Sequence, residues 1–508
     1  MASATTNWKT PRKKTSRPER TCCCARCYVL PRCWSEPAGY CLNGEYKMRV
    51  QEGARANFLV RGARVIDGTG RDPIVDGYVL VKNGRIESVG ANDKPSDRVD
   101  IQAIDARGMT VMPGLIDFHT HLTYNTAEPD TWRLEMRQSV ELNTVYATCN
   151  ASRVLDMGFT TIGDGGCRGL IGPAIRDAVA RGLIRGPRIF STGPIMSGPG
   201  GLHDDVPPWA DLRIANGLNA IVSSVQEARH EVIQQVKGGV DWIKVAASGV
   251  AGSPYSHADQ DDLSYEIMRE VVSTAARFGK AVHAHAHSIG GIRAAVEAGV
   301  ISMHAVEFVD LETLQEIKKK GIVISPTIAW LHARGLNPPF GSANNRIRHE
   351  AWTAYERARN MLKEARRLDI DVGIGTDACH RFPHIRDGVL EMEYFLEAGY
   401  SPLEILRAGT LISAKGIGKQ NEIGSLEAGK RADILFVDGD PSEDITVLRD
   451  KAKIKKIIID GIEQSRGEPA AHPYPDFRVR DWAHLEEGQV PVGVDVPAAV
   501  APFVRTGL

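Results

Sequence analysis

Eight short apolar segments, separated by stretches with helical periodicity, constrain the fold of this 508-residue chain more than any other feature. Stretches 226–236 and 352–368, for example, carry apolar residues at the i, i+3, i+4 spacing of an amphipathic helix. Strands that alternate with helices form parallel sheets, and eight such units predict closure into a barrel. We therefore predict an α/β fold with a (β/α)8 TIM-like barrel over residues 111–420. The predicted strands are Val111–Phe118, Thr160–Gly165, Arg188–Thr192, Trp242–Ala247, Ala281–Ala286, Ile301–His304, Val323–Thr327 and Val372–Thr376.

Two β-rich segments flank the predicted barrel. Residues 57–110 contain short alternating strands broken by glycine. Within them Asn83-Gly84 predicts a hairpin, because both residues tolerate the positive φ angles of a type I′ turn. Residues 421–465 repeat the pattern of strands and turns. We predict that the two segments form one small composite β-sandwich.

The two ends of the chain differ in composition from its body. Residues 1–47 hold nine Lys and Arg against three Glu and show no helix or strand period. We expect them to be disordered, or a non-native extension upstream of a start at Met48. Only Cys24 and Cys27 have C-x2-C spacing there, so a zinc finger is not predicted. Residues 466–508 are rich in proline and polar groups and are expected to form a tail.

The overall composition indicates an ordinary globular protein. Hydrophobic residues make up 43% and charged residues 25% of the chain, and its net charge is −1. This balance does not favour binding to nucleic acid or to a membrane surface. The chain also lacks the run of about 18 apolar residues that a membrane-spanning helix needs. Scattered cysteines in the body favour a reducing compartment, and hence a cytoplasmic location.

A His-x-His pair ends the first predicted barrel strand, V-M-P-G-L-I-D-F-H-T-H-L. Side chains alternate faces along a strand, so His119 and His121 point the same way. Imidazole is a common metal ligand, and α/β barrels place their active sites at the carboxyl ends of the strands. The pair therefore predicts a metal site, although two polar residues at a strand end are the simpler alternative.

The stretch P-G-L-I-D-F-H-T-H resembles the first strand of the amidohydrolase superfamily, whose members bind one or two metals in a (β/α)8 barrel. The later stretch G-x-L-x-x-G-K-x-A-D-x also resembles this family, and the resemblance covers about residues 57–465. Within the superfamily the chain looks most like the branch with prolidase-like dipeptidases, the ochratoxin-type amidase, and carbamate and phenylurea hydrolases.

The resemblance implies four further metal ligands on later strands. Lys244 lies within I-K-V-A-A-S-G; from the strand alone it could equally pair with a carboxylate or reach out to solvent. The family pattern makes it a lysine carbamylated by carbon dioxide, and burial would favour this by lowering the pKa of its amine. The same pattern implies His285, His304 and Asp377 as the remaining ligands. Asp377, in G-I-G-T-D, would also be the catalytic proton acceptor.

Substrate-binding residues are expected beside this centre. In V-H-A-H-A-H-S, the family pattern places His287 towards the substrate, whereas His283 lies deeper and is expected to be structural. Loops after the strands supply further candidates, each of which could instead be an ordinary solvated loop residue. These candidates are His203, Tyr255, His257, His332 and Arg334.

These features predict a metal-dependent hydrolase that cleaves a C–N bond of a small-molecule amide with metal-activated hydroxide. An acyclic substrate, such as an Xaa-Pro dipeptide or an N-acyl amino acid, is the first interpretation. A cyclic-amide hydrolase of the imidazolonepropionase or hydantoinase kind is the second, and an inactive scaffold is the third. Two divalent ions are expected, zinc first and manganese or cobalt as alternatives. The sequence leaves open whether the protein forms a homo-oligomer.

Overall fold

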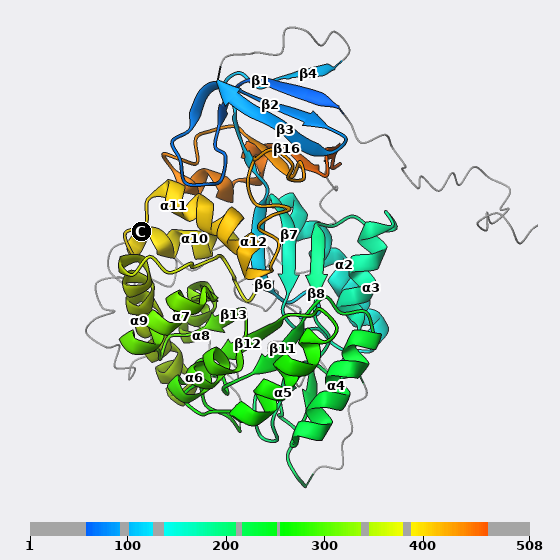
Figure 1. Ribbon diagram of the computed structural model, residues 1–508, viewed down its shortest axis with the longest axis vertical. Coiled ribbons are helices and arrows are strands. Elements are labelled where there is room, and N and C mark those ends of the chain that lie inside the picture. Colours follow the sequence, from blue (N-terminus) through cyan, green and yellow to red (C-terminus); the bar gives the residue numbers. More distant parts are fainter. Residues whose placement is uncertain are drawn as a thin grey trace, which may run out of the picture. The chain divides into compact units, whose positions relative to one another are not determined.

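Strands from both ends of the body pair in one large sheet (Figure 1). The computed structural model describes residues 57–91, 101–124, 137–209, 216–250, 255–336, 345–378 and 388–465. The expectations for residues 1–47 and 466–508 lie outside these ranges. No helix within the described ranges is long and apolar enough to cross a membrane.

The large sheet has the strand order β17-β16-β15-β5-β1-β2-β3, with β4 beside β1. Its central strand β5 runs parallel to β1 and antiparallel to β15, so the early and late segments of the chain meet there. The predicted hairpin at Asn83-Gly84 is confirmed, because φ is 50° at Asn83 and 72° at Gly84 and the flanking strands pair. The strands are β1 (Phe58–Val65), β2 (Ile74–Lys82), β3 (Arg85–Ala91), β4 (Gln102–Asp105), β5 (Thr110–Pro113), β15 (Ile434–Val437), β16 (Ile454–Ile459) and β17 (Ile462–Glu463).

The remaining strands are parallel and form a three-stranded sheet, β6-β7-β8, and a six-stranded sheet, β10-β9-β11-β12-β13-β14. Between the two sheets, the Asp241 backbone N–H donates to the Ser191 carbonyl oxygen at 2.8 Å, but no continuous strand ladder joins them. The strands are β6 (Leu115–Thr120), β7 (Phe159–Asp164), β8 (Arg188–Ser191), β9 (Ile195–Ser197), β10 (Asn219–Ile221), β11 (Ile243–Ala246), β12 (Val282–Ala286), β13 (Ser302–Ala305) and β14 (Val323–Ser325).

The first predicted barrel strand, Val111–Phe118, is divided between two sheets, which corrects that prediction. Thr110–Pro113 belongs to the large sheet as β5, and β6 starts a new parallel sheet at Leu115. Gly114 makes this change of sheet feasible: a Cβ there would lie 1.9 Å from the Thr160 Oγ1, so only glycine fits against β7.

The eighth predicted strand, Val372–Thr376, pairs through isolated bridges instead of a continuous ladder. The bridge Ile324↔Val372 joins it to β14, and Thr120↔Ala378 joins its far end to β6. Backbone hydrogen bonds from Gly373 to Ile324 (2.9 Å) and from Phe118 to Ile374 (3.0 Å) support both sides. The segment 372–378 therefore lies between β14 and β6 and is bridged to each.

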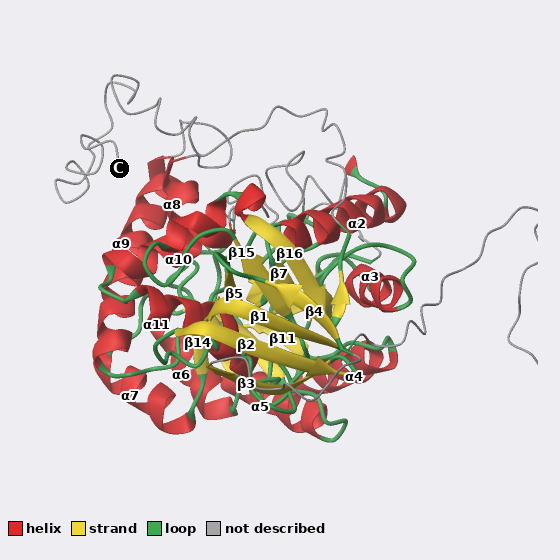
Figure 2. Cartoon of the chain, turned by 90° about the horizontal axis from the view of Figure 1, so that it is seen from above, coloured by secondary structure: helices red, strands yellow, loops and turns green. Residues whose placement is uncertain are grey.

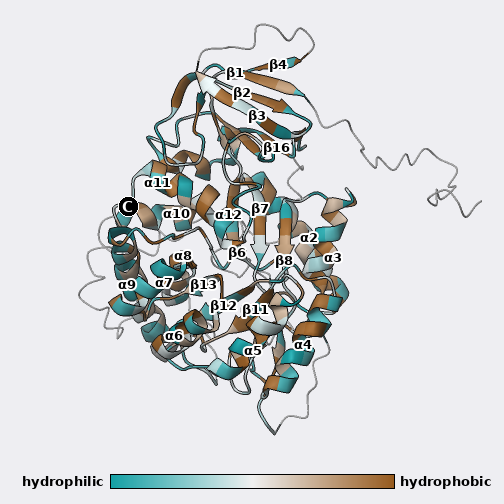
Figure 3. Cartoon of the chain, in the orientation of Figure 1, coloured by the Kyte–Doolittle hydropathy of each residue, from teal (hydrophilic) through white to brown (hydrophobic). Residues whose placement is uncertain are grey.

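Helices surround the parallel strands (Figure 2). Several begin at a serine that caps the helix; Ser224, for example, accepts a hydrogen bond from the Glu227 N–H. Hydrophobic colours mark strands such as β1 and β11, whereas outer helices such as α9 carry many hydrophilic residues (Figure 3). The helices are α2 (Val140–Asp156), α3 (Ile171–Ala180), α4 (Val225–Lys237), α5 (Tyr265–Ala276), α6 (Ile289–Ala298), α7 (Leu311–Lys320), α8 (Ile328–Leu336), α9 (Asn345–Arg367), α10 (Gly388–Glu397), α11 (Pro402–Arg407), the π-helix η3 (Ala408–Ile412), α12 (Ser413–Gly416), and the 3-10 helices η4 (Ile445–Arg449) and η5 (Lys451–Lys453).

Candidate active site

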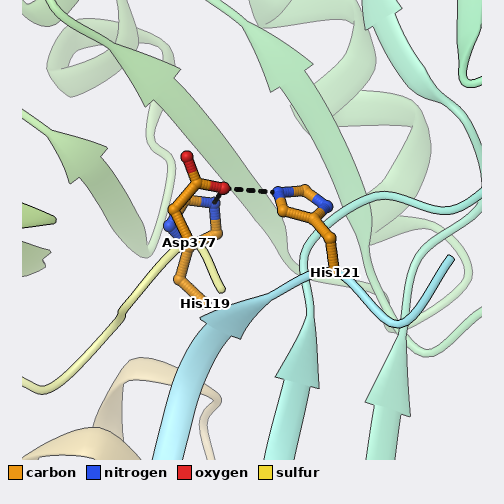
Figure 4. Close-up of side chains that lie close together, drawn as sticks. All are labelled: His119, His121 and Asp377. Carbon is orange, nitrogen blue, oxygen red and sulfur yellow. Dashed lines mark ion pairs between the residues drawn. The ribbon is translucent and has the colours of Figure 1, made fainter. Parts of the chain in front are cut away.

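His119, His121 and Asp377 come together at the carboxyl end of β6 (Figure 4). The Nε2 atom of His121 lies 2.9 Å from the Asp377 Oδ1, and the Nε2 atom of His119 lies 3.9 Å from the same oxygen. One ligand atom from each residue lies within 4.8 Å of the others, and both histidines are buried. Two imidazoles and a carboxylate at these distances can share one cation.

Backbone contacts hold the three side chains. The Nδ1 of His121 lies 2.8 Å from the Gly166 carbonyl oxygen, which can only accept, so Nδ1 carries the proton and the lone pair that can bind a metal is on Nε2. The Asp377 N–H donates to the His119 carbonyl oxygen at 2.8 Å. Asp377 also has a φ of 54°, in the left-handed region that non-glycine residues seldom adopt.

Asp117, which the sequence analysis did not single out, ties β6 to the segment that carries Asp377. Its carboxylate accepts hydrogen bonds from the Thr376 Oγ1 at 2.6 Å and from the His119 backbone N–H at 3.1 Å. Burial raises the pKa of Asp117 to about 7, and these hydrogen bonds partly oppose the rise. Its signal was available two residues before the first histidine, in D-F-H-T-H.

The register of the parallel strands brings the later candidates to the same region. His285 on β12 is paired with His304 on β13, and the His304 ring lies 3.9 Å from the His119 ring between centroids. Burial lowers the pKa of His119, His285 and His304 well below the ordinary histidine range, with smaller contributions from neighbouring cationic groups. Neutral imidazoles, which keep a lone pair for a metal, are therefore favoured at all three positions.

Lys244, the candidate for carbamylation, lies on β11. It is 1% exposed, and its Nζ has no hydrogen-bond partner among the described residues. Burial lowers the pKa of Lys244 to about 7, and Asp377 opposes that shift. A lysine paired with a carboxylate was one sequence interpretation, and no such ion pair is present in the described part of the chain.

His283 lies two residues before His285 on β12, level with Lys244. Its Nδ1 contacts the Ser302 hydroxyl at 2.7 Å, and its ring lies 3.7 Å from the Trp242 ring. These contacts agree with the structural role expected for it. By contrast, His287, four residues after His283, pairs with Glu307, a residue that the sequence analysis did not single out.

His203 reaches the centre through an aromatic residue. The Tyr124 ring stacks on the His121 ring at 4.2 Å, and its hydroxyl lies 3.2 Å from the His203 Nε2. Burial, and to a smaller extent the neighbouring His121, lower the pKa of His203 to about 3. Tyr124 was missed in the sequence, where it follows the His-x-His stretch after only two residues.

The other loop candidates have partners of their own. The Nδ1 of His257 lies 2.9 Å from the Glu350 Oε1 on α9, and Tyr255 is 42% exposed. His332 on α8 bonds the Tyr394 hydroxyl and stacks on Tyr355 at 5.1 Å, in a group of aromatic rings. Arg334 lies over the Trp330 ring at 5.3 Å. Among these residues, Arg334 is the one whose charge also influences His203.

The residues fit a divalent metal. Buried polar atoms without a partner in the described part of the chain include the Nδ1 atoms of His119 and His304 and the Lys244 Nζ. Leaving such atoms unpaired in the protein interior is costly unless a further group satisfies them. Nitrogen and carboxylate donors of this kind are the ligands that zinc, manganese and cobalt share.

Comparisons with known proteins agree with this centre. A family model described as "Amidohydrolase family" matches residues 110–462. Ochratoxinase from Aspergillus niger is 27% identical over 428 residues, which cover 78% of this chain and 85% of that protein. Imidazolonepropionase from Thermoanaerobacter pseudethanolicus is 26% identical over 398 residues, or 72% of this chain and 85% of that protein. A crystal structure of an Xaa-Pro dipeptidase with bound methionine in the active site has a TM-score of 0.72 at 27% identity, covering 81% of this chain and all of that one.

Proposed function

Because the chain belongs to the amidohydrolase family, we propose that it hydrolyses an acyclic C–N bond, as in an Xaa-Pro dipeptide or an N-acyl amino acid. The observation that carries the proposal is the cluster of His119, His121 and Asp377. The likeness to an Xaa-Pro dipeptidase and to an ochratoxinase supports an acyclic substrate. We propose that the two parallel sheets and segment 372–378 together form one (β/α)8 barrel, and that the large sheet belongs to a composite β-sandwich.

The metal-binding residues proposed are His119, His121, Lys244, His285, His304 and Asp377. We propose two divalent ions, zinc first, and a carbamylated Lys244; the burial of this lysine and the lack of a partner for its Nζ among the described residues support this modification. Bound divalent ions would lower the pKa of water and polarise the substrate carbonyl.

The side chains of this site can supply the proton transfers. Asp377 is 16% exposed in its side chain, so its carboxylate is open to water and substrate while its backbone is fixed. It would accept a proton from the attacking water and deliver it to the leaving nitrogen. His287 and His203 would contact the substrate. The hydroxyl of Tyr124 would hold the His203 ring in place for this contact. Arg334 would bind a substrate carboxylate in the way arginine commonly does.

A screen of substrates tests the proposal. Protein purified with zinc should hydrolyse members of a panel of Xaa-Pro dipeptides and N-acyl amino acids, and removal of metal with a chelator should abolish the activity until zinc is restored. A panel of lactams and imidazolones tests the second candidate, which the likeness to an imidazolonepropionase favours. Turnover of the cyclic panel alone would replace the first proposal by the second.

Carbamylation of Lys244 has its own test. Protein prepared with 13C-labelled bicarbonate should show a carbamate carbon signal by NMR, and Lys244→Ala should lose both the signal and the bound metal. A metal-loaded wild-type protein without that signal would contradict the modification.

A further inference from the structure

His287 and Glu307 form a buried pair beside the metal-binding residues. His287 follows β12 and Glu307 follows β13, and the Nδ1–H of His287 donates to the Glu307 Oε1. Their side chains are only 2% and 0% exposed. The His287 ring lies 4.4 Å from the His285 ring, which belongs to the proposed metal site. A histidine–carboxylate pair therefore lies directly against that site.

The pair is only partly satisfied. The Nε2 of His287 and the Oε2 of Glu307 are buried and have no hydrogen-bond partner within the described ranges. The backbone of His287 is anchored, because its N–H donates to the Ser248 Oγ at 2.7 Å. With the backbone and Nδ1 both engaged, Nε2 is the atom of this ring that remains available to a ligand.

The backbone before Glu307 is strained. Ala305 has a φ of 82° and Val306 a φ of 78°, and a positive φ is especially unfavourable for a β-branched residue such as valine. The Val306 N–H is nevertheless held by the Ala286 carbonyl oxygen at 2.9 Å. This turn follows the end of β13 and places Glu307 beside His287. Strain of this kind persists where the surrounding structure imposes it, and such positions cluster at functional sites.

We propose that Glu307 is a positioning residue that acts through His287. By accepting the Nδ1–H it fixes the orientation and tautomer of the ring, so that Nε2 forms a hydrogen bond to the substrate beside the metal-binding residues. Glu307 itself touches neither substrate nor metal. This inference rests on the proposed function for the identity of the substrate, but the state of the ring can be measured without any substrate.

The first experiment measures that state directly. Zinc-loaded protein labelled with 15N in its histidine rings reports by NMR which ring nitrogen carries the proton. The His287 signals, assigned by their loss in His287→Gln, should show a protonated Nδ1 in the wild-type protein. In Glu307→Leu, they should shift towards the Nε2–H tautomer or a mixture of both. An unchanged His287 pattern in Glu307→Leu would overturn the inference, whatever the substrate screen finds.

The second experiment measures kinetics on alanyl-proline. Glu307→Leu should lower kcat/KM by about 10- to 100-fold, the usual effect of removing a partner that orients an active-site group. Glu307→Gln, which keeps an acceptor oxygen, should recover part of this loss. The double variant with His287→Gln should be no slower than His287→Gln alone, because one residue acts through the other.

Two controls separate positioning from stability and from metal binding. Glu393→Gln changes a largely buried carboxylate that pairs instead with Arg449, and it should keep wild-type kinetics. The bound zinc in Glu307→Gln and Glu307→Leu should equal that of the wild-type protein. Loss of zinc, or losses that add in the double variant, would contradict a role exerted through His287.

Discussion

Loss of Arg188 should weaken the junction between β8 and the large sheet. Its guanidinium forms an ion pair with Asp433, just before β15, and a second with Asp460 at 3.0 Å. The side chains of Arg188 and Asp433 are 15% and 5% exposed, so this is a nearly buried pair. Burial alone would lower the pKa of Arg188, but the two carboxylates raise it by more than burial lowers it. The guanidinium therefore stays charged.

Arg188→Met would leave Asp433 without a cation. Asp460 keeps Arg431 as a partner at 2.8 Å, whereas among the described residues Asp433 would keep only the Asp460 backbone N–H at 3.0 Å. Removing one partner of a buried pair costs about 3–5 kcal/mol, because the remaining charge is desolvated and uncompensated. Replacing both partners, in Arg188→Met with Asp433→Leu, should cost much less than the single change.

Equilibrium unfolding in urea measures this prediction. The free energy of unfolding should fall by about 3–5 kcal/mol in Arg188→Met, with an unchanged dependence on urea. As a matched control, Arg293→Met removes an arginine whose pair with Asp310 is 55% and 43% exposed, and it should cost under about 1 kcal/mol. If Arg188→Met costs no more than this control, or if the double variant is less stable than the single one, the reasoning is wrong.

Three further predictions concern the site and the limits of the fold. Asp377→Asn should lower kcat by about 10²–10⁴ with a much smaller change in KM, and near wild-type turnover with metal retained, measured by mass spectrometry of the metal, would exclude the proton-transfer role. Gly114→Ala should destabilise by about 1–3 kcal/mol through the clash with Thr160, and Thr160→Ala should recover part of that loss in urea unfolding. A protein that begins at Met48 should keep the stability and kcat of the full chain, since the composition of residues 1–47 offers no core; a large loss of either would contradict this.

The periodicity of the sequence was sufficient to predict most of the parallel strands, although β9 and β10 were not among the predicted segments. Apolar runs such as Thr160–Gly165 and Ala281–Ala286 became β7 and β12 within a residue at either end. The split of Val111–Phe118 was not predictable from hydropathy, because both halves are equally buried. It depends on the close approach of Gly114 to Thr160, a contact between segments far apart in the sequence. The eighth strand, rich in glycine, has a weaker ladder than its apolar pattern implied.

The resemblance to the amidohydrolase family supplied the metal-binding candidates on the later strands, and strand geometry explains why two of them lie side by side. Residues two apart on a strand share a face, and parallel neighbours in register share a level, so His285 and His304 meet without help from the loops. The residues that contact these histidines from the turns cannot be predicted from strand periodicity. Tyr124 and Glu307 act through turns whose path follows from tertiary contacts, and His332 lies among aromatic rings that its loop position did not suggest.

Unusual backbone angles explain why the turns after these strands could not be predicted from the sequence. Left-handed φ angles occur at Ala305, Val306, Thr327 and Asp377, at or just beyond the carboxyl ends of strands or of segment 372–376. Of these four residue types, only aspartate tolerates that conformation comparatively well. A glycine at such a position would have indicated a tight turn, but the residues found there do not. The remaining structure must hold them there, through bonds such as that from the Asp377 N–H to the His119 carbonyl oxygen. The carboxylates of Asp377 and Glu307 therefore owe their placement to left-handed backbone held by the surrounding strands, and substitutions in those supporting strands should affect catalysis even where they touch no ligand.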